Sequence, residues 1–340
     1  MKRKACNNQV EKNTQTLKSL MDNQFNADTA IDLIRNKADP EIKNSNGKSV
    51  DDLIVEFYLN KTKFIDSKQL KKTSFLYNCE PVTINVGTLK GSYVVMKEIT
   101  PKQDASRIEK LEVLINFCKE TYFLQQLTEA EAPNVVKYLN FSVNKLSNQI
   151  IMEYTSNGSL GSCIENDASK PFNWEYRLQI IKGIIRGLKC IHLFNIIHCD
   201  LKSDNIFIDK DYQAKIGDFG SAQIKNEKVN KALTSTCYRA PEVFQFDYSE
   251  KSDIFGLGLT IWEACAWDKI WFKIMDIIEE EQEMYDYYQS GKRFEIPSDT
   301  SPKLSNLIKW CWETEAKKRP FSAELPDELN NEIEFKPNQI

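Results

Sequence analysis

The sequence is poor in the residues that build most metal and redox sites. It contains only two histidines, His192 and His198, and no two of its nine cysteines have CxxC spacing. A histidine cluster for catalysis or metal binding therefore has little support, and neither a zinc site nor a dithiol redox motif is indicated. An odd number of scattered cysteines in a chain of this size is typical of reduced thiols.

Long apolar runs are also absent. No stretch approaches the length needed to cross a bilayer, and the N-terminus is basic and then polar, unlike a signal peptide. The net charge of -4 gives no general attraction to nucleic acid or to an anionic membrane. We therefore expect a cytoplasmic protein that binds neither nucleic acid nor membrane.

Residues 1–60 are rich in Asn, Lys and Asp, and they contain helical patterns separated by turns. Gly47 can adopt a positive φ angle there, and Asn44 and Asn46 can cap the turn with their side chains. The order of helix, Ala38-Asp39-Pro40 turn, Asn/Gly turn and helix resembles the end of an ankyrin array. A single partial repeat would be a terminal cap, because stacked repeats need neighbours. A plain polar helical extension is an equally open interpretation.

A lysine-rich segment, residues 61–73, is interpreted as a solvated linker. Beyond it, β-branched runs predict strands at 82–86, 92–98 and 149–154, with a helix at about 108–127. After Gly158 the pattern becomes mainly helical, with periodic stretches at 176–193, 252–267, 272–290 and 304–312. A small strand-rich half followed by a larger helical half predicts an α+β fold.

Three motifs in the helical half follow one another in a fixed order. They are His198-Cys199-Asp200-Leu201-Lys202-Ser203-Asp204-Asn205, Asp218-Phe219-Gly220 and Ala240-Pro241-Glu242. Together they resemble the catalytic loop, magnesium loop and activation-segment end of the eukaryotic protein kinase superfamily. The resemblance covers about residues 74–325 and implies a bilobal fold. A small antiparallel sheet with one main helix would form the N-lobe (74–154), larger helices the C-lobe (155–325), and residues 326–340 a tail.

The resemblance gives each motif position a task in phosphoryl transfer, which depends more on positioning and charge neutralisation than on covalent chemistry. Asp200 would accept the proton of a substrate hydroxyl, and Lys202 would offset negative charge on the transferring phosphate. Asn205 and Asp218 would hold Mg²⁺ through oxygen ligands, which this hard cation prefers. The implied reaction transfers the γ-phosphate of ATP to hydroxyl groups of protein substrates.

The strand-rich half carries the expected nucleotide contacts. Val94-Val95-Met96-Lys97 resembles the strand with the ATP-binding lysine, and alternation along a strand puts Val95 and Lys97 on one face. Glu120 is the expected partner of Lys97, because Leu124 and Leu127 then lie on the inward side of the same helix. The other nucleotide-binding residues implied by the resemblance are the gatekeeper Met152, the hinge residues Glu153 and Thr155, and Phe207 beneath the base.

Other matches to the family are structural. The resemblance implies that Asp253 fixes the backbone of the catalytic loop, that His198 packs against Phe219, and that Arg319 pairs with Glu242. Cys311-Trp312 and Arg319-Pro320 resemble the close of tyrosine-kinase and tyrosine-kinase-like domains.

The type of hydroxyl acceptor is predicted from two positions. Lys202 stands two residues after Asp200, and Ser235 precedes the Tyr238-to-Glu242 segment. By analogy with the family, both favour a serine/threonine kinase, and the resemblance at the close of the domain indicates the tyrosine-kinase-like group.

The sequence departs from the family pattern at the loop that covers the phosphates. Counted back from Lys97, this loop falls near residues 77–82, which contain no glycine. Glycines let backbone N–H groups approach phosphates, whereas Pro81 lacks a donor and Glu80 would repel phosphate. Gly87 and Gly91 are expected to mark the following turn, between the second and third strands. We therefore expect weak or unusually magnesium-dependent nucleotide binding.

Two more positions differ from the family. Cys199 replaces the arginine that usually precedes Asp200 and pairs with a phosphorylated activation loop, so loop phosphorylation alone is not expected to activate the chain. Val95 stands where alanine usually contacts adenine, and its extra bulk narrows the pocket.

Three functions stay open on the sequence. An active kinase is favoured because Lys97, Glu120 and the four motif residues of the helical half are all present. A pseudokinase that acts as a scaffold or switch is the alternative, supported by the glycine-free loop. The third is a protein-binding adaptor that captures a partner through residues 1–60.

Overall fold

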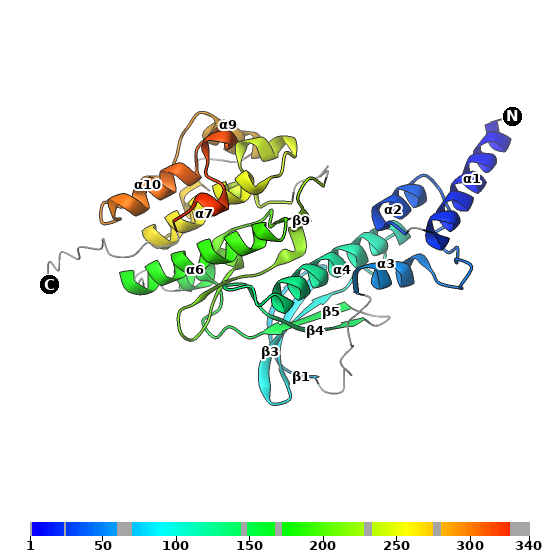
Figure 1. Cartoon of the computed structure of the whole chain (residues 1–340), viewed down its shortest axis with the longest axis horizontal. Helices are drawn as coiled ribbons and strands as arrows, with labels where there is room; N and C mark the ends of the chain where they lie inside the picture. The colour runs from blue at the N-terminus through cyan, green and yellow to red at the C-terminus, as the bar shows by residue number, and fades with distance from the viewer. Residues whose placement is uncertain are drawn as a thin grey trace. The chain divides into compact units, whose positions relative to one another are not determined.

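The computed structural model describes residues 2–23, 25–59, 70–143, 148–166, 172–227, 233–274 and 280–326. The chain divides into two compact units, of which the first contains Met1–Gln126 and Lys137–Tyr154 and the second contains Leu127–Val136 and Thr155–Ile340. Figure 1 follows the chain through both units, from blue at the N-terminus to red near the C-terminus.

The first unit is built on a five-stranded antiparallel sheet with the strand order β1-β2-β3-β5-β4. Its strands are β1 (Leu70–Cys79), β2 (Val82–Leu89), β3 (Ser92–Ile99), β4 (Tyr138–Val143) and β5 (Asn148–Glu153). In the central strand β3, Val94 and Met96 are buried against Ile151 of β5. The opposite face of β3 therefore carries Val95 and Lys97, as the alternation predicts.

Two predictions about this sheet need correction. Part of the predicted linker, residues 61–69, lies outside the described residues, but Leu70–Thr73 already belong to β1, so the sheet begins before the expected boundary at 74. Gly91 does lie in the turn between β2 and β3, with φ +87°, but Gly87 lies inside β2. A Cβ at Gly87 would meet Met96 Cε at 2.6 Å and Lys71 O at 2.7 Å, so close packing explains this glycine better than a turn.

One long helix, α4 (Arg107–Glu129), accompanies the sheet, as predicted. From Leu111 to Leu127 its side chains are mostly buried, and residues as differently placed around the helix as Leu111, Phe117, Cys118 and Leu124 are fully buried. A helix that rests on a sheet and faces water on its other side would show one apolar stripe. Because α4 is buried on several sides, other elements besides the sheet must cover it.

The N-terminal helices α1 (Lys2–Asp22), α2 (Ala27–Arg35) and α3 (Val50–Leu59) belong to the same unit, and Figure 1 shows α2 and α3 beside α4. The turn before α3 has the predicted chemistry: Gly47 has φ +76°, and Asn44 Oδ1 accepts hydrogen bonds from the N–H groups of Asn46 and Lys48. Leu17, Ala30 and Ile54 are buried and give these helices an apolar core.

Polar and aromatic contacts join these helices to α4. Arg107 of α4 pairs with both carboxylate oxygens of Asp51 in α3, and its Nε lies 3.0 Å from Glu41 Oε1. Arg35 of α2 pairs with Glu112, and the rings of Tyr58 and Tyr122 meet edge to face at 6.3 Å. The N-terminal helices thus cover the helix that carries Glu120.

The pair between Arg107 and Asp51 is expected to contribute measurably to this cover. Replacing both residues singly and together by Ala should give a coupling free energy of about 0.5–1 kcal/mol, as for other partly exposed pairs with good geometry. The measurement is urea unfolding of the four proteins in such a cycle, with Lys102→Ala, at an exposed position before α4, as the control. Additive effects of the two replacements would contradict the contact.

The second unit is mainly helical. Its helices are α5 (Leu160–Asn166), α6 (Trp174–Leu193), α7 (Glu250–Ala266), α8 (Ile270–Ile274), α9 (Glu281–Gln289) and α10 (Pro302–Cys311). Two short two-stranded sheets pair β6 (Ile196–Ile197) with β9 (Gln223–Ile224), and β7 (Ile206–Ile208) with β8 (Ala214–Ile216). A small antiparallel sheet with one main helix, followed by a helical unit, confirms the α+β prediction.

Helix α7 forms the core of the second unit, and its residues from Ser252 to Cys265 are all buried. It packs against α6 and α10. Gly256 lets it approach the catalytic loop, because a Cβ there would lie 2.7 Å from Leu201 O. The buried helix α7 therefore packs directly against the catalytic loop and supports it.

The single helical pattern predicted at 272–290 is wrong. Helix α8 and helix α9 are separate, and Glu280 before α9 has extended backbone angles of φ -119° and ψ 153°. Within the described residues, no helix is both long and apolar enough to cross a membrane.

Candidate active site

The backbone of the catalytic loop is fixed by one buried carboxylate. Asp253 of α7 accepts hydrogen bonds from the N–H groups of His198 at 2.7 Å and Cys199 at 2.9 Å, and its Oδ2 lies 2.9 Å from His192 Nε2. These bonds hold Cys199 in a left-handed conformation with φ +65°, which is uncommon outside glycine. Asp253 therefore fixes the loop as predicted.

Cys199 itself is buried, and burial raises the pKa of its thiol well above the ordinary value. The thiol therefore stays protonated and is not expected to react. His198 packs on Phe219 with a ring separation of 5.1 Å, as predicted, and its Nε2 lies 3.0 Å from Gly217 O.

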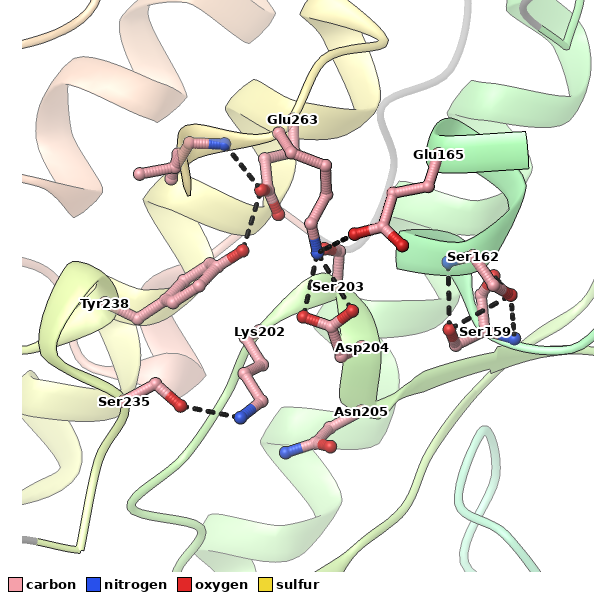
Figure 2. A network of polar contacts seen from close by, with 12 residues as sticks. Ser159, Ser162, Glu165, Lys202, Ser203, Asp204, Asn205, Ser235, Tyr238 and Glu263 are labelled. Atoms are coloured by element: carbon pink, nitrogen blue, oxygen red, sulfur yellow. Dashed lines mark hydrogen bonds and ion pairs between the residues drawn. The ribbon is translucent and has the colours of Figure 1, made fainter. Parts of the chain in front are cut away.

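Asp200, Lys202 and Ser235 form a compact polar group. Lys202 Nζ lies 2.8 Å from Asp200 Oδ2 and donates to Ser235 Oγ at 2.6 Å, while the Ser235 N–H donates to Asp200 Oδ1 at 2.9 Å (Figure 2 shows Lys202 and Ser235). Burial lowers the pKa of Lys202, but the charge and hydrogen bond of Asp200, together with the charges of Asp204 and Asp218, leave that pKa above the ordinary value. Lys202 is therefore a cation held 2.8 Å from a side-chain oxygen of Asp200.

Asn205 and Asp218 are brought close through the backbone. Asn205 ends the short 3-10 helix η2 (Ser203–Asn205) and donates from Nδ2 to Asp200 O at 2.7 Å. Its carbonyl accepts from the N–H of Gly217 at 3.0 Å, and Gly217 directly precedes Asp218. Asp218 has φ +58°, and its Oδ1 accepts from Gly220 N at 3.4 Å. The two predicted metal ligands therefore stand on adjacent, hydrogen-bonded segments.

This donor set fits a magnesium–nucleotide complex. Mg²⁺ is usually bound by one or two protein oxygens together with substrate phosphates and water, and not by a full protein cage. An amide oxygen and a carboxylate oxygen meet that requirement. Among the described residues no cluster of three or more His, Cys, Asp or Glu suited to a metal occurs, so a site made of protein ligands alone is not found there.

In the first unit, Lys97 pairs with Glu120 as predicted. Nζ lies 2.7 and 2.8 Å from the two carboxylate oxygens, and the side chains are 8% and 1% exposed. Burying two charges is favourable only with such close geometry, and removing one partner would leave an uncompensated charge. β3 and α4 are thereby tied together at the lysine.

The hinge residues are found partly as predicted. Val95 of β3 lies opposite Met152 of β5, and Met152 is buried. Glu153 donates its N–H to Lys137 O at 3.0 Å, so this N–H is already used within the sheet and is not offered to adenine. Thr155 and Phe207 belong to the second unit, where the Phe207 ring packs so closely on Gly217 that a Cβ there would lie 2.8 Å away.

The predicted phosphate loop is the turn between β1 and β2, where Glu80 and Pro81 connect Cys79 to Val82. Pro81 O accepts a hydrogen bond from Thr100 N at 2.9 Å, which anchors the turn to the end of β3. The turn thus has the predicted place and no glycine.

Sequence reasoning missed one charged residue near the site. Lys269, between α7 and α8, is 3% exposed and binds Asp204 and Ser203, next to Asn205. It belongs to no motif, and the neighbouring charged residues Asp268 and Lys273 do not distinguish it from a surface lysine.

The fold and these residues define the catalytic domain of a protein kinase. The chain belongs to the protein kinase family, because the family model described as protein kinase domain matches residues 82–328. Membership implies the use of ATP and a divalent metal ion. The match begins after residue 60, so the ankyrin-like interpretation of residues 1–60 stays a prediction.

The chain is similar to curated kinases from several different organisms. It is 32% identical over 256 residues to the putative serine/threonine-protein kinase/receptor R831 of Acanthamoeba polyphaga mimivirus, covering 72% of this chain and 14% of that protein. It is 27% identical over 272 residues to serine/threonine-protein kinase STY17 of Arabidopsis thaliana, covering 79% and 45%. It is 30% identical over 274 residues to the dual specificity protein kinase shkD of Dictyostelium discoideum, covering 77% and 34%.

The chain spans less than half the length of each of these three relatives. Their similarity supports the predicted serine/threonine kinase of the tyrosine-kinase-like group, and the comparisons give no support to the pseudokinase alternative.

Proposed function

We propose that this chain is an ATP-dependent protein serine/threonine kinase, with its kinase domain at about 70–325. The observation that carries the proposal is the arrangement of Asp200, Lys202 and Ser235, in which a fixed carboxylate and a fixed cation lie 2.8 Å apart. A carboxylate can accept the proton of an attacking hydroxyl, and a cation beside it can stabilise charge on the transferring phosphate.

The remaining residues would bind and orient the nucleotide. Lys97, held by Glu120, would contact the phosphates, and Asn205 and Asp218 would supply oxygen ligands to Mg²⁺, which offsets phosphate charge when bound. Val95, Met152 and Phe207 would surround the base, with backbone groups of Glu153 and Thr155 at its edge. Each of these assignments rests on the position of the residue in the family motifs.

The partners follow from the same proposal. The family implies protein substrates and ATP. The net charge of -4 argues against binding to nucleic acid. Residues 1–60 would offer a surface to a further protein partner, and the protein would act in the cytoplasm.

Nucleotide binding gives a direct test. ATP with Mg²⁺ should raise the melting temperature of the chain, and ATP without Mg²⁺ should raise it much less, because the metal neutralises charge beside Asp218. Asp218→Asn should remove most of the magnesium-dependent part. Asp247→Asn, at an exposed position in the same unit, is the matched control and should behave as wild type. A wild-type chain that shows no shift under either condition would contradict the proposal.

A further inference from the structure

A buried lysine, Lys269, forms ion pairs with partly exposed carboxylates beside the turn that carries Asn205. The ammonium of Lys269 lies 2.9 and 2.8 Å from the two carboxylate oxygens of Asp204 and 3.0 Å from Ser203 Oγ, with Glu165 Oε1 at 3.8 Å. Figure 2 shows Ser203, Asp204 and Asn205 side by side on this turn, with Glu165 facing it from α5. Lys269 therefore binds both residues that precede Asn205.

The fold makes room for this lysine and holds its backbone. The N–H of Ile270, the next residue, donates to Glu263 Oε1 at 2.9 Å, and the same oxygen accepts from Tyr238 Oη at 2.7 Å. Glu263 is fully buried; burial raises its pKa, and the charge of Lys269 opposes this rise. Tyr238 belongs to the predicted activation segment, so the network links that segment to the metal-ligand turn.

Gly161 of α5 provides the space. A Cβ at this position would lie 2.3 Å from Asp204 Oδ1 and 2.9 Å from Lys269 Nζ. A side chain at this position would push the two charged groups apart. The ion pair between Lys269 and Asp204 therefore depends on glycine at position 161.

Burying an ammonium group is costly unless it is paired. Lys269 contacts Ser203 and Asp204, while Asn205 itself is held by hydrogen bonds from its N–H to Lys202 O at 3.0 Å and from its Nδ2 to Asp200 O at 2.7 Å. The side-chain oxygen of Asn205 is thus aimed by two sets of bonds, one from the catalytic loop and one from Lys269.

We propose that Lys269 is a positioning residue for the metal site: through Ser203 and Asp204 it fixes the turn that presents Asn205 to the divalent cation. This inference rests on the proposed function, because it takes Asn205 as a metal ligand. Residues behind metal ligands typically change metal affinity 10- to 100-fold when they are removed, without touching the metal.

The test compares Lys269→Met with Lys273→Met. Lys273 of α8 is the matched control, since it also pairs with a carboxylate, that of Asp268, but is 50% exposed. In calorimetric titration of Mn²⁺ in the presence of a non-hydrolysable ATP analogue, Lys269→Met should raise the apparent dissociation constant of Mn²⁺ about tenfold. The affinity for the metal-free analogue should stay near that of wild type. Lys273→Met should change neither.

Hydrogen exchange gives a readout that needs no ligand. The amides of Asn205 and Ile206, which close the turn, should exchange faster in Lys269→Met than in wild type. If this variant does not fold because Asp204 is left unpaired, Lys269→Met with Asp204→Asn removes both charges, and the same two effects are expected in the double variant.

Wild-type Mn²⁺ affinity and wild-type exchange rates in the variant that folds would overturn the inference. A wild-type chain that binds no Mn²⁺–nucleotide complex would instead contradict the proposed function, and the exchange rates of the turn would still decide whether Lys269 fixes it.

Discussion

Replacement of Asp200 by Asn is expected to lower kcat for phosphate transfer by about 10²–10⁴-fold, the usual contribution of a positioned general base. Asn keeps the shape of the side chain and an oxygen that can accept from the N–H of Ser235. It cannot take up the substrate proton, and it no longer neutralises Lys202, which lies 2.8 Å from the carboxylate.

Steady-state kinetics with a generic basic protein substrate measures this effect. Because the charge of Asp200 also raises the pKa of Lys202, the variant should have a lower Lys202 pKa, and its residual activity should fall at a less alkaline pH than that of wild type. KM for ATP should change little. A variant that keeps more than a tenth of wild-type kcat would show that Asp200 is not the base.

The largest expected effect on stability comes from Arg319. Its side chain is fully buried, and its guanidinium donates to both carboxylate oxygens of Glu242 at 2.6 and 2.9 Å and to three backbone carbonyls. Arg319→Ala leaves Glu242 and these carbonyls without their donor, and removing one partner of such a pair costs about 3–5 kcal/mol.

Urea unfolding of Arg319→Ala should therefore show a much lower midpoint than wild type. Lys317→Ala, two residues away, removes a side chain that is 81% exposed and should change the free energy of unfolding by no more than about 0.5 kcal/mol. Equal losses of unfolding free energy in the two variants would mean that the buried Arg319–Glu242 pair stabilises the fold no more than an exposed side chain does.

The residues of the site were largely predictable because each belongs to a linear motif or to one helical face. The motif around Asp200 specifies its own spacing, and Glu120 follows from the inward side of one helix, so the Lys97–Glu120 pair could be found from sequence. The same holds for Asp253 and for the Arg319–Glu242 pair, whose members lie in separate motifs.

Other features could not be predicted, for physical reasons that differ from case to case. β1 is exposed along nearly all of its length, so it has no alternating pattern to mark its start at Leu70. Gly87 looks like a turn glycine but is required by close packing between strands, which only the structure reveals.

Long-range contacts were equally invisible. The pair of Arg107 with Asp51 joins residues that lie in different helices and follow no pattern. A single charged residue such as Lys269 likewise gives no sign that it is buried and paired with Asp204. Contacts of this kind depend on the assembled fold, not on local sequence.

The most direct test of the kinase assignment is transfer of labelled phosphate from ATP to a generic basic protein in the presence of Mg²⁺, followed by identification of the phosphorylated residue type. The account predicts phosphoserine and phosphothreonine with wild type, and near-complete loss with Asp218→Asn. Absence of transfer by a folded wild-type chain that binds the nucleotide, or equal transfer by Asp218→Asn, would contradict it.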